Sequence, residues 1–229
     1  MDVFGEALKD QFSKPPSETL WVHNSYDEPE EMPVDIYFRD ERDMPDLELK
    51  ALDLCKGKVL DVGAGVGSHA LILQRRGLDV TGMDISASAV AIMKQRGLKK
   101  AIEGNILKYT GETYDTLLFM MNGIGLTGSL PGLKSFLNSA KALLKTGGQL
   151  VFDSCDLSYL YQVKPFPIHG YYGEITFRYE YKSIKGNWFK WIYVDQKTLI
   201  EVAGQQGWNT EIIFEDDSDQ YLARLTLIS

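Results

Sequence analysis

The chain has 229 residues, of which 44% are hydrophobic and 24% charged, a composition that excludes wholesale disorder and allows one domain with a buried core. The formal net charge is −8, and residues 1–56 carry it, with 15 acidic against 6 basic side chains. Because the rest is close to neutral, we expect no nucleic-acid partner.

The sequence also indicates the cellular compartment in which the protein is expected. Cys55 and Cys155 lie far apart and suggest no disulfide framework, which fits a reducing environment. The first residues lack the pattern of a signal peptide, and no apolar stretch approaches the length of a membrane span. We therefore expect a cytoplasmic protein with no membrane partner.

The segment before the first predicted sheet strand is acidic and irregular. It contains a predicted short helix at residues 4–12, a predicted loop at 15–33, and a helix that begins near Pro45 and ends at Gly57. We interpret residues 1–46 as an N-terminal cap or lid and residues 47–229 as the main domain.

From Lys58 onward, short apolar strands alternate with amphipathic helices, which is typical of a parallel sheet covered on both faces. The predicted strands are residues 58–62, 79–83, 100–103, 113–121 and 149–153. The predicted helices are residues 69–76, 86–96 and 133–144, stopped by Gly77, Gly97 and Gly147-Gly148 respectively, and Ser86 offers an N-cap for the second.

The pattern changes after the fifth strand. Residues 170–194 are predicted to be an inserted β-hairpin, with strands at 175–181 and 188–194 and a turn at 185–187. Asp195 is a predicted cap for a helix that ends at Gly207, and a terminal hairpin follows. With the turn at 185–187, one hairpin face would be aromatic, typical of a core, a dimer contact or a pocket for a planar substrate.

The stretch Val59-Leu60-Asp61-Val62-Gly63-Ala64-Gly65-Val66-Gly67 is the most informative in the chain. Glycines at a strand-to-helix turn let the backbone approach a ligand closely. The next strand ends in Asp84, where an acid can accept hydrogen bonds from ribose hydroxyls. The dinucleotide fingerprint needs a third glycine or alanine where this chain has Ser68, so an NAD(P)-dependent oxidoreductase is disfavoured.

This arrangement, with an acid two positions before the first glycine, resembles motif I of the class I S-adenosylmethionine-dependent methyltransferases. The resemblance covers roughly residues 47–229 and implies a Rossmann-like, doubly wound sheet of seven strands with an antiparallel last strand. It implies S-adenosylmethionine as the cofactor, S-adenosylhomocysteine as the product, and a small-molecule acceptor. The implied cofactor-binding residues are Asp61, Gly63, Ala64, Gly65, Gly67, Asp84, Ile85, Asn105, Ile106 and Met121.

Predictions about the acceptor are less specific. Asn122 follows the fourth strand and is either a substrate contact or part of a tight turn. The other candidate substrate residues are Tyr37, Arg39, Tyr171 and Trp191, with an ion pair to Asp40 or Glu41 as the alternative for Arg39. No catalytic base can be identified; His169 is a weak candidate, and the histidines show no metal-ligand spacing.

Two function hypotheses therefore lead. The first is a methyltransferase that acts on a small molecule by in-line displacement, as a monomer or homodimer. The second is a non-catalytic module that binds S-adenosylmethionine.

Overall fold

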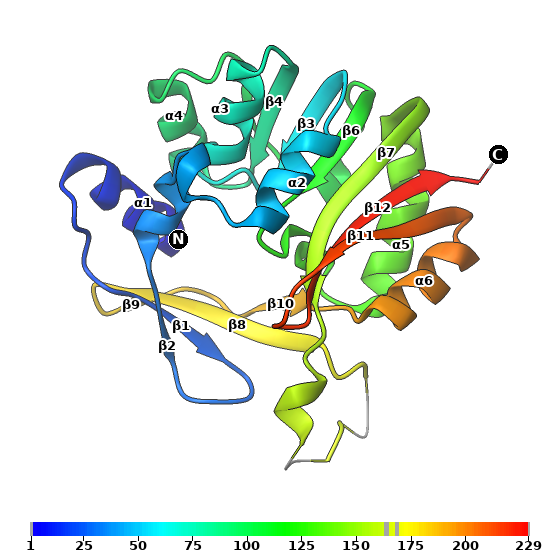
Figure 1. The fold of residues 1–229 in the computed structure, drawn as a ribbon. Coiled ribbons are helices and arrows are strands. Elements are labelled where there is room, and N and C mark those ends of the chain that lie inside the picture. Colours follow the sequence, from blue (N-terminus) through cyan, green and yellow to red (C-terminus); the bar gives the residue numbers. More distant parts are fainter. Residues whose placement is uncertain (1, 163–164, 168–169, 229) are drawn as a thin grey trace. The chain divides into compact units, whose positions relative to one another are not determined.

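A computed structural model describes residues 2–162, 165–167 and 170–228 of the chain (Figure 1). Its α-helices, in chain order, are α1 (Val3–Ser13), α2 (Asp46–Leu54), α3 (Ser68–Arg75), α4 (Ala87–Gln95), α5 (Leu130–Ala140) and α6 (Gln196–Gln205). None of the described helices is long and apolar enough to cross a membrane. The strands are β1 (Leu20–Asn24), β2 (Glu30–Met32), β3 (Lys58–Val62), β4 (Asp79–Asp84), β5 (Ala101–Glu103), β6 (Tyr114–Phe119), β7 (Leu144–Cys155), β8 (Glu174–Tyr181), β9 (Ile184–Lys185), β10 (Phe189–Ile192), β11 (Trp208–Glu215) and β12 (Gln220–Leu227).

Seven strands form a mixed sheet in the order β11-β12-β7-β6-β3-β4-β5. Strand β4 pairs in parallel with β5, and β6 pairs in parallel with β7. Strand β12 is antiparallel to both of its neighbours, β7 and β11. The predicted doubly wound α/β fold with an antiparallel last strand is therefore confirmed.

The chain divides into two compact units. The first comprises Met1–Pro45, Leu60–Tyr109 and Thr176–Phe189, and the second comprises Asp46–Val59, Thr110–Ile175 and Lys190–Ser229. In the first unit, α3 and α4 lie beside β4, and in the second, α6 lies beside β11 (Figure 1). The assignment of residues 1–46 as a lid stays a prediction.

The first unit has its own apolar core, built from segments that are distant in sequence. Helix α1 packs on α4, and the buried cluster draws on α1, β1, α4 and β8. Its buried members are Val3, Ala7, Leu8, Leu20, Val34, Val66, Ala89, Ile92 and Tyr181.

The second unit buries its largest side chains along β6, β7, α5, β11 and β12. They are Tyr114, Phe119, Phe136, Phe152, Trp208 and Tyr221. The polar atoms of two of these rings are satisfied inside the core, because Trp208 donates to the carbonyl of Leu137 and Tyr221 donates to that of Val194.

Helices α3 and α4 end as the sequence predicts. Gly77 has φ of +90°, its N–H donates to Gln74, and the N–H of Leu78 donates to Leu73. The same pair of bonds recurs at the end of α4, where Gly97 has φ of +96°. Both ends are Schellman motifs, in which left-handed glycine satisfies the last helical carbonyls.

The prediction of a loop at residues 15–33 is wrong, because this segment forms β1 and β2. Strand β1 pairs antiparallel with β2 on one side and with β8 on the other, with Leu20 opposite Tyr181 and Val22 opposite Tyr179. The N-terminal segment and the insertion therefore share a second sheet, of order β10-β8-β1-β2 with β9 paired to β8. Strand β1 is five residues long and gains its partner from far along the chain, so its sequence alone carries a weak signal.

Two further boundaries are corrected. The hairpin turns at Lys182 and Ser183, both with positive φ, because Tyr181 pairs with Ile184; the predicted turn at 185–187 is wrong, and so is the register derived from it. The third predicted helix ends at Ala140, and Gly147 lies inside β7 with φ of +73°. A register shift between β6 and β7 accommodates the residues before Gln149, so these glycines mark a bulge and not a helix end.

Candidate functional site

The glycine loop after β3 is an open cradle in the first unit. Gly63, Gly65 and Gly67 have φ of +68°, +55° and +82°, in the left-handed region that side chains disfavour. A Cβ on Gly63 would meet nothing within 4 Å, and one on Gly65 would meet only Tyr37, at 3.7 Å. A Cβ on Gly67 would lie 2.9 Å from Met93, so this third glycine serves helix packing while the first two keep space open. The N–H of Ala64 donates to the carbonyl of Met83 and ties the loop to β4.

Asp84 closes one side of this cradle. One carboxylate oxygen accepts from the N–H of Gly65 and the other from the N–H of Ser86, each at 2.8 Å. Burial raises the pKa of Asp84 to about 6, against the opposing effect of the hydrogen bonds from Ser86 and Gly65. The next residue, Ile85, is 74% exposed, so its side chain is accessible beside Asp84.

Asp61 is a second buried carboxyl in the same unit. It lies on β3, two residues before Gly63, and is only 1% exposed. Its Oδ2 atom has no hydrogen-bond partner among the described residues. Burial raises the pKa of Asp61 to about 6, and the nearby His69 opposes this shift. A buried polar atom without a partner is costly, so it indicates a group that Asp61 is built to receive.

Of the two predicted residues after β5, one lies at the surface and one in the core. The N–H of Gly104 donates to the carbonyl of Asp84, which brings this loop next to the cradle. Asn105 is exposed and uses its side-chain oxygen to cap a short 3-10 helix through Leu107, while Ile106 is buried.

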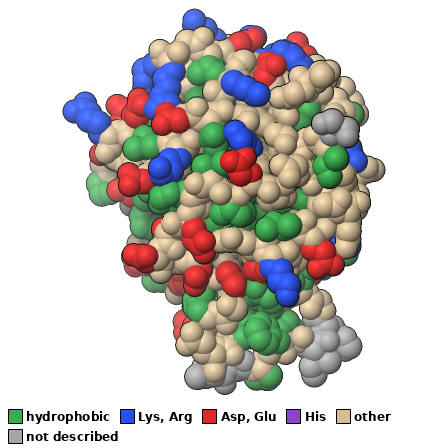
Figure 2. All heavy atoms as spheres, turned by 45° about the vertical axis from the view of Figure 1, so that its right-hand side comes forward, with side chains coloured by type: hydrophobic (Ala, Val, Ile, Leu, Met, Phe, Trp, Pro, Cys, Tyr) green, Lys and Arg blue, Asp and Glu red, His purple; other side chains and the backbone are tan. Residues whose placement is uncertain are grey.

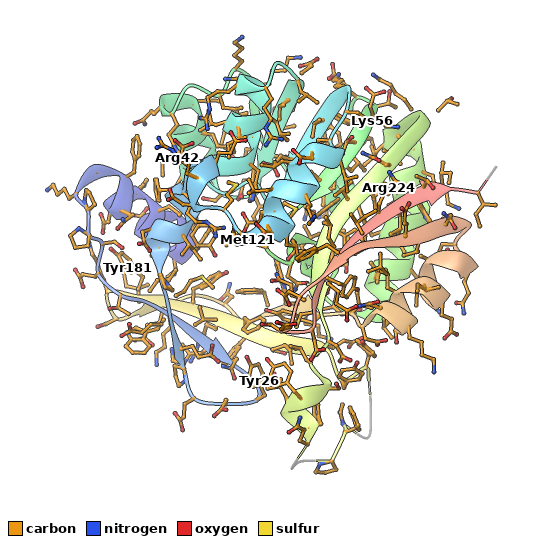
Figure 3. The ribbon with its side chains drawn as sticks, in the orientation of Figure 1. Tyr26, Arg42, Lys56, Met121, Tyr181 and Arg224 are labelled. Carbon is orange, nitrogen blue, oxygen red and sulfur yellow. The ribbon has the colours of Figure 1, made fainter. Side chains whose placement is uncertain are left out.

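Met121 and Asn122 belong to the second unit, after β6, and both have left-handed backbones with φ of 57° and 53° (Met121 is labelled in Figure 3). The side-chain oxygen of Asn122 accepts from Ser154 Oγ at 2.9 Å, and its Nδ2 donates to the carbonyl of Ile192. Its backbone N–H donates to Asp153, a buried residue whose pKa burial raises to about 6. Asn122 thus joins β6 to β7 and to the end of β10.

Trp191 and Tyr171, two candidate substrate residues, also make structural bonds in the second unit. Trp191 Nε1 donates to the backbone carbonyl of Asn122, and its ring lies so close to Gly125 that a Cβ there would overlap it. The Tyr171 hydroxyl donates to Asp195 Oδ2 at 2.5 Å and accepts from the Asp195 N–H.

Tyr37 and Arg39 belong to the first unit. The ring of Tyr37 lies beside Gly65, as described above, and Arg39 follows the 3-10 helix Val34–Phe38. Asp40 and Glu41, the alternative partners considered for Arg39, bind Arg75 at the end of α3 and Arg76 just after it.

Three residues near the cradle, Asp2, Phe4 and Tyr179, escape prediction as site residues. The side chain of Asp2 caps α1 by accepting from Gly5 and receives the Ser86 hydroxyl at 2.5 Å. Phe4 and Tyr179 pack against each other and, through Phe4, against Tyr37. The alternation of 175–181 hints at Tyr179, whereas nothing in the sequence marks Asp2 or Phe4.

Two of the three histidines, His23 and His69, lie in the described residues. His69 is buried in α3 near Asp61, and His23 pairs with Glu180 at 2.6 Å. His169 lies outside the described residues. Within residues 2–162, 165–167 and 170–228, no group of three or more His, Cys, Asp or Glu side chains is placed to hold a metal ion.

Replacing Asp195 by alanine is expected to lower the free energy of unfolding by about 2 kcal/mol, because the change removes both a helix cap and a half-buried hydrogen-bond partner of Tyr171. Asp195 Oδ1 caps α6 by accepting from Thr198, while Oδ2 holds Tyr171. Urea denaturation measures the effect, with exposed Lys197→Ala in the same helix as the control. Equal midpoints for the two variants would contradict this role.

Comparison with known proteins shows which protein family this chain resembles. The profile of a family described as a methyltransferase domain matches residues 59–148. A S-adenosylmethionine-dependent methyltransferase from Bacteroides fragilis, solved with S-adenosyl-L-homocysteine, has 40% sequence identity and a TM-score of 0.93, over 100% of this chain and 95% of that one.

Curated relatives match over less of their length. A ubiquinone biosynthesis O-methyltransferase of Cronobacter sakazakii is 30% identical over 42% of each chain. A demethylmenaquinone methyltransferase of Tropheryma whipplei is 30% identical over 48% of this chain and 46% of its own. The chain thus spans less than half of these two relatives. The full-length likeness to the Bacteroides fragilis protein nevertheless shows that this chain belongs to the S-adenosylmethionine-dependent methyltransferase family.

Proposed function

We propose that this protein transfers a methyl group from S-adenosylmethionine to a small-molecule acceptor. The observation that carries the proposal is the cradle of the first unit, where two open left-handed glycines lie beside the buried carboxyl groups of Asp61 and Asp84. A Cβ on Gly63 or Gly65 would occupy this space, and Asp61 Oδ2 has no partner among the described residues. These features fit a ligand with a ribose and an ammonium group.

Each part of the cradle has a proposed task. Asp84, whose oxygens already accept from Gly65 and Ser86, has further lone pairs for two ribose hydroxyls. Asp61 supplies the negative charge for an ammonium group. Gly63 has no side chain, so the ligand can approach the backbone there. Ile85, exposed beside Asp84, offers apolar contact to the adenine, and Asn105 and Ile106 are proposed to complete that part of the site. The cofactor role of Met121 stays a prediction from the sequence.

S-adenosylmethionine, when bound, supplies a methyl group on a positively charged sulfur. The contribution of the chain is to hold the reactants in line and to exclude water, which can supply several kcal/mol of the barrier reduction. No general base is assigned, and Asn122 is better suited to positioning, since both ends of its amide bind protein groups.

The acceptor is proposed to be a small molecule. Two relatives named for quinone biosynthesis support this class, as does an aromatic surface near the cradle. Acidic and basic side chains are interspersed over the face shown in Figure 2, which supports the absence of a nucleic-acid partner. A cytoplasmic location is proposed from the sparse cysteines. A homodimer is also proposed, and size-exclusion chromatography tests it.

Calorimetric titration tests the proposal, with S-adenosylmethionine, S-adenosylhomocysteine and NADH as ligands. Micromolar binding of the first two, followed by methyl transfer in an acceptor screen, is the expected result. Binding without transfer to any acceptor would favour a non-catalytic binding module. Binding of NADH alone would favour an oxidoreductase and would contradict the proposal.

The affinity for S-adenosylhomocysteine is expected to fall as pH drops below about 6, by about tenfold per pH unit for each carboxylate that must be ionised. The pKa values of Asp84 and Asp61 are both about 6, and their ionised forms are the ones proposed to bind the ribose and the ammonium, so protonation of either competes with binding. Calorimetry between pH 5 and 8 measures the slope, and Asp84→Asn is expected to remove the contribution of Asp84 and leave that of Asp61. A slope of the same size in that variant would assign the effect to another group.

The free energy of unfolding of the ligand-free protein is expected to gain from the same two carboxyl groups as pH falls, whereas the affinity for the ligand decreases. Asp61 and Asp84 have folded pKa values of about 6, above the ordinary aspartate pKa of 3.8. The folded state therefore holds more protons than the unfolded state between these two values. Their contribution to the free energy of unfolding rises as pH falls through this window.

A further inference from the structure

A row of five aromatic rings leads away from the cradle in the first unit. The ring centroids of Tyr37 and Phe4 are 5.0 Å apart, and Phe4 stacks on Tyr179 at 5.2 Å. Tyr179 lies 5.2 Å from Phe189, which lies 6.2 Å from Phe177. The five rings come from α1, the 3-10 helix after β2, β8 and the start of β10. We call them the aromatic row.

The two β8 members of the aromatic row lie on one face of the second sheet. Phe177 and Tyr179 alternate along β8 with Arg178 and Glu180, and successive side chains of a strand point to opposite faces. On the opposite face Glu180 pairs with His23, and Arg178 lies 4.6 Å over the ring of Trp188.

The row begins at the glycine cradle. Tyr37 Cδ1 is 3.7 Å from the position that a Cβ on Gly65 would take. Burial raises the pKa of the Tyr179 phenol, and the nearby Tyr37 and Asp84 raise it further. The Tyr179 phenol is therefore neutral.

The five rings of the aromatic row pack on one another, but none of them is fully buried. All five members of the row are only partly buried, whereas Tyr181, two residues beyond Tyr179 on β8, is 2% exposed and bonds through its hydroxyl to Asp10 (labelled in Figure 3). Phe4, Tyr37 and Tyr179 pack against the core cluster of this unit, yet each stays partly exposed. Partly exposed rings beside a ligand cradle indicate a binding surface, because full burial in the core would gain more hydrophobic energy.

We propose that the aromatic row is the platform on which a planar, aromatic acceptor stacks beside the cofactor. This inference rests on the proposed function, which it deepens by naming the acceptor class. Offset and edge-on ring contacts favour a flat, unsaturated molecule over a saturated one of the same size. Tyr179, at the centre of the row, makes the largest contribution, because it contacts both Phe4 and Phe189.

Two matched probes test the platform on the full chain saturated with S-adenosylhomocysteine: 2-naphthol, which is planar, and decahydro-2-naphthol, its saturated counterpart. Calorimetry is expected to show 2-naphthol binding about tenfold more tightly. Tyr179→Leu is expected to reduce the preference to within about twofold, whereas Tyr179→Phe keeps the ring and the preference.

Trp21→Leu is the matched control, since Trp21 is an exposed aromatic opposite Glu180, on the other face of the same sheet. It should leave the preference intact. Equal affinity for the two probes, no binding of 2-naphthol, or an unchanged preference in Tyr179→Leu would overturn the platform. Circular dichroism and retained S-adenosylhomocysteine binding verify that each variant is folded.

The two proposals fail separately. If the unmodified chain does not bind S-adenosylhomocysteine, the proposed function is contradicted. Binding of 2-naphthol that still depends on Tyr179 would then support the platform alone.

Discussion

Asp84→Ala is expected to weaken binding of S-adenosylmethionine about 100-fold. A carboxylate that accepts two hydroxyl hydrogen bonds contributes roughly 1.5–3 kcal/mol for each bond, of which water recovers part when the side chain is lost. The substitution also removes the acceptor for the N–H groups of Gly65 and Ser86, which loosens the cradle. Calorimetry with both S-adenosylmethionine and its demethylated product measures the loss.

Two further variants define the cause. Asp84→Asn retains the shape and one acceptor oxygen, so its affinity should fall between those of the unmodified protein and Asp84→Ala. Asp79→Ala, at the exposed start of β4, removes a surface pair with Lys100 and should change affinity by less than about twofold. If Asp84→Ala bound as tightly as Asp79→Ala, the ribose role of Asp84 would be wrong.

Asn122→Ala is expected to lower the free energy of unfolding by about 3 kcal/mol. The change leaves buried Ser154 without its acceptor and the carbonyl of Ile192 without its donor, and each such loss costs about 1 kcal/mol or more. Alanine must also adopt φ of 53°, which asparagine tolerates better. Urea denaturation measures the difference, with exposed Asn209→Ala as the control.

Asn122→Gly separates the two contributions. Glycine adopts positive φ without cost, so this variant should be more stable than Asn122→Ala by about 1 kcal/mol while still lacking both side-chain bonds. A normal unfolding midpoint for Asn122→Ala, combined with lost methyl transfer, would instead favour Asn122 as a direct substrate contact.

The cofactor cradle could be predicted from sequence because its signals are local. Glycines at 63 and 65, an acid at 61 and another at the end of β4 each stand within a few residues of the turn that they shape. The ends of α3 and α4 were equally readable, since Gly77 and Gly97 are each followed by the leucine of a Schellman motif.

The parts that could not be predicted depend on distant partners. Strand β1 becomes a strand because β8 lies beside it, and its own five residues resemble many loops. The turn at Lys182 and Ser183 uses residues that rarely mark a two-residue hairpin, whereas Lys185-Gly186-Asn187 carries the stronger turn signal.

For the site residues too, the sequence predicts local features but not contacts with distant partners. Phe4 acquires its place beside Tyr37 only when α1 packs on α4. The sequence alone places Asn122 next to the fourth strand. The partners of its side-chain amide, Ser154 and Ile192, lie on later elements, so the sequence could not predict them.

The pairing of β1 with β8 has a consequence for synthesis on the ribosome. His23 and Glu180, whose side chains pair across these strands, are 157 positions apart in the sequence. At a synthesis rate of about 5–20 residues per second, roughly 8–30 seconds pass between the synthesis of β1 and that of β8. During this interval the unpaired edge of β1 and the apolar side chains Leu20 and Val22 are available to chaperones. We expect nascent chains stalled before residue 174 to be bound by them, and chains released beyond residue 181 to escape.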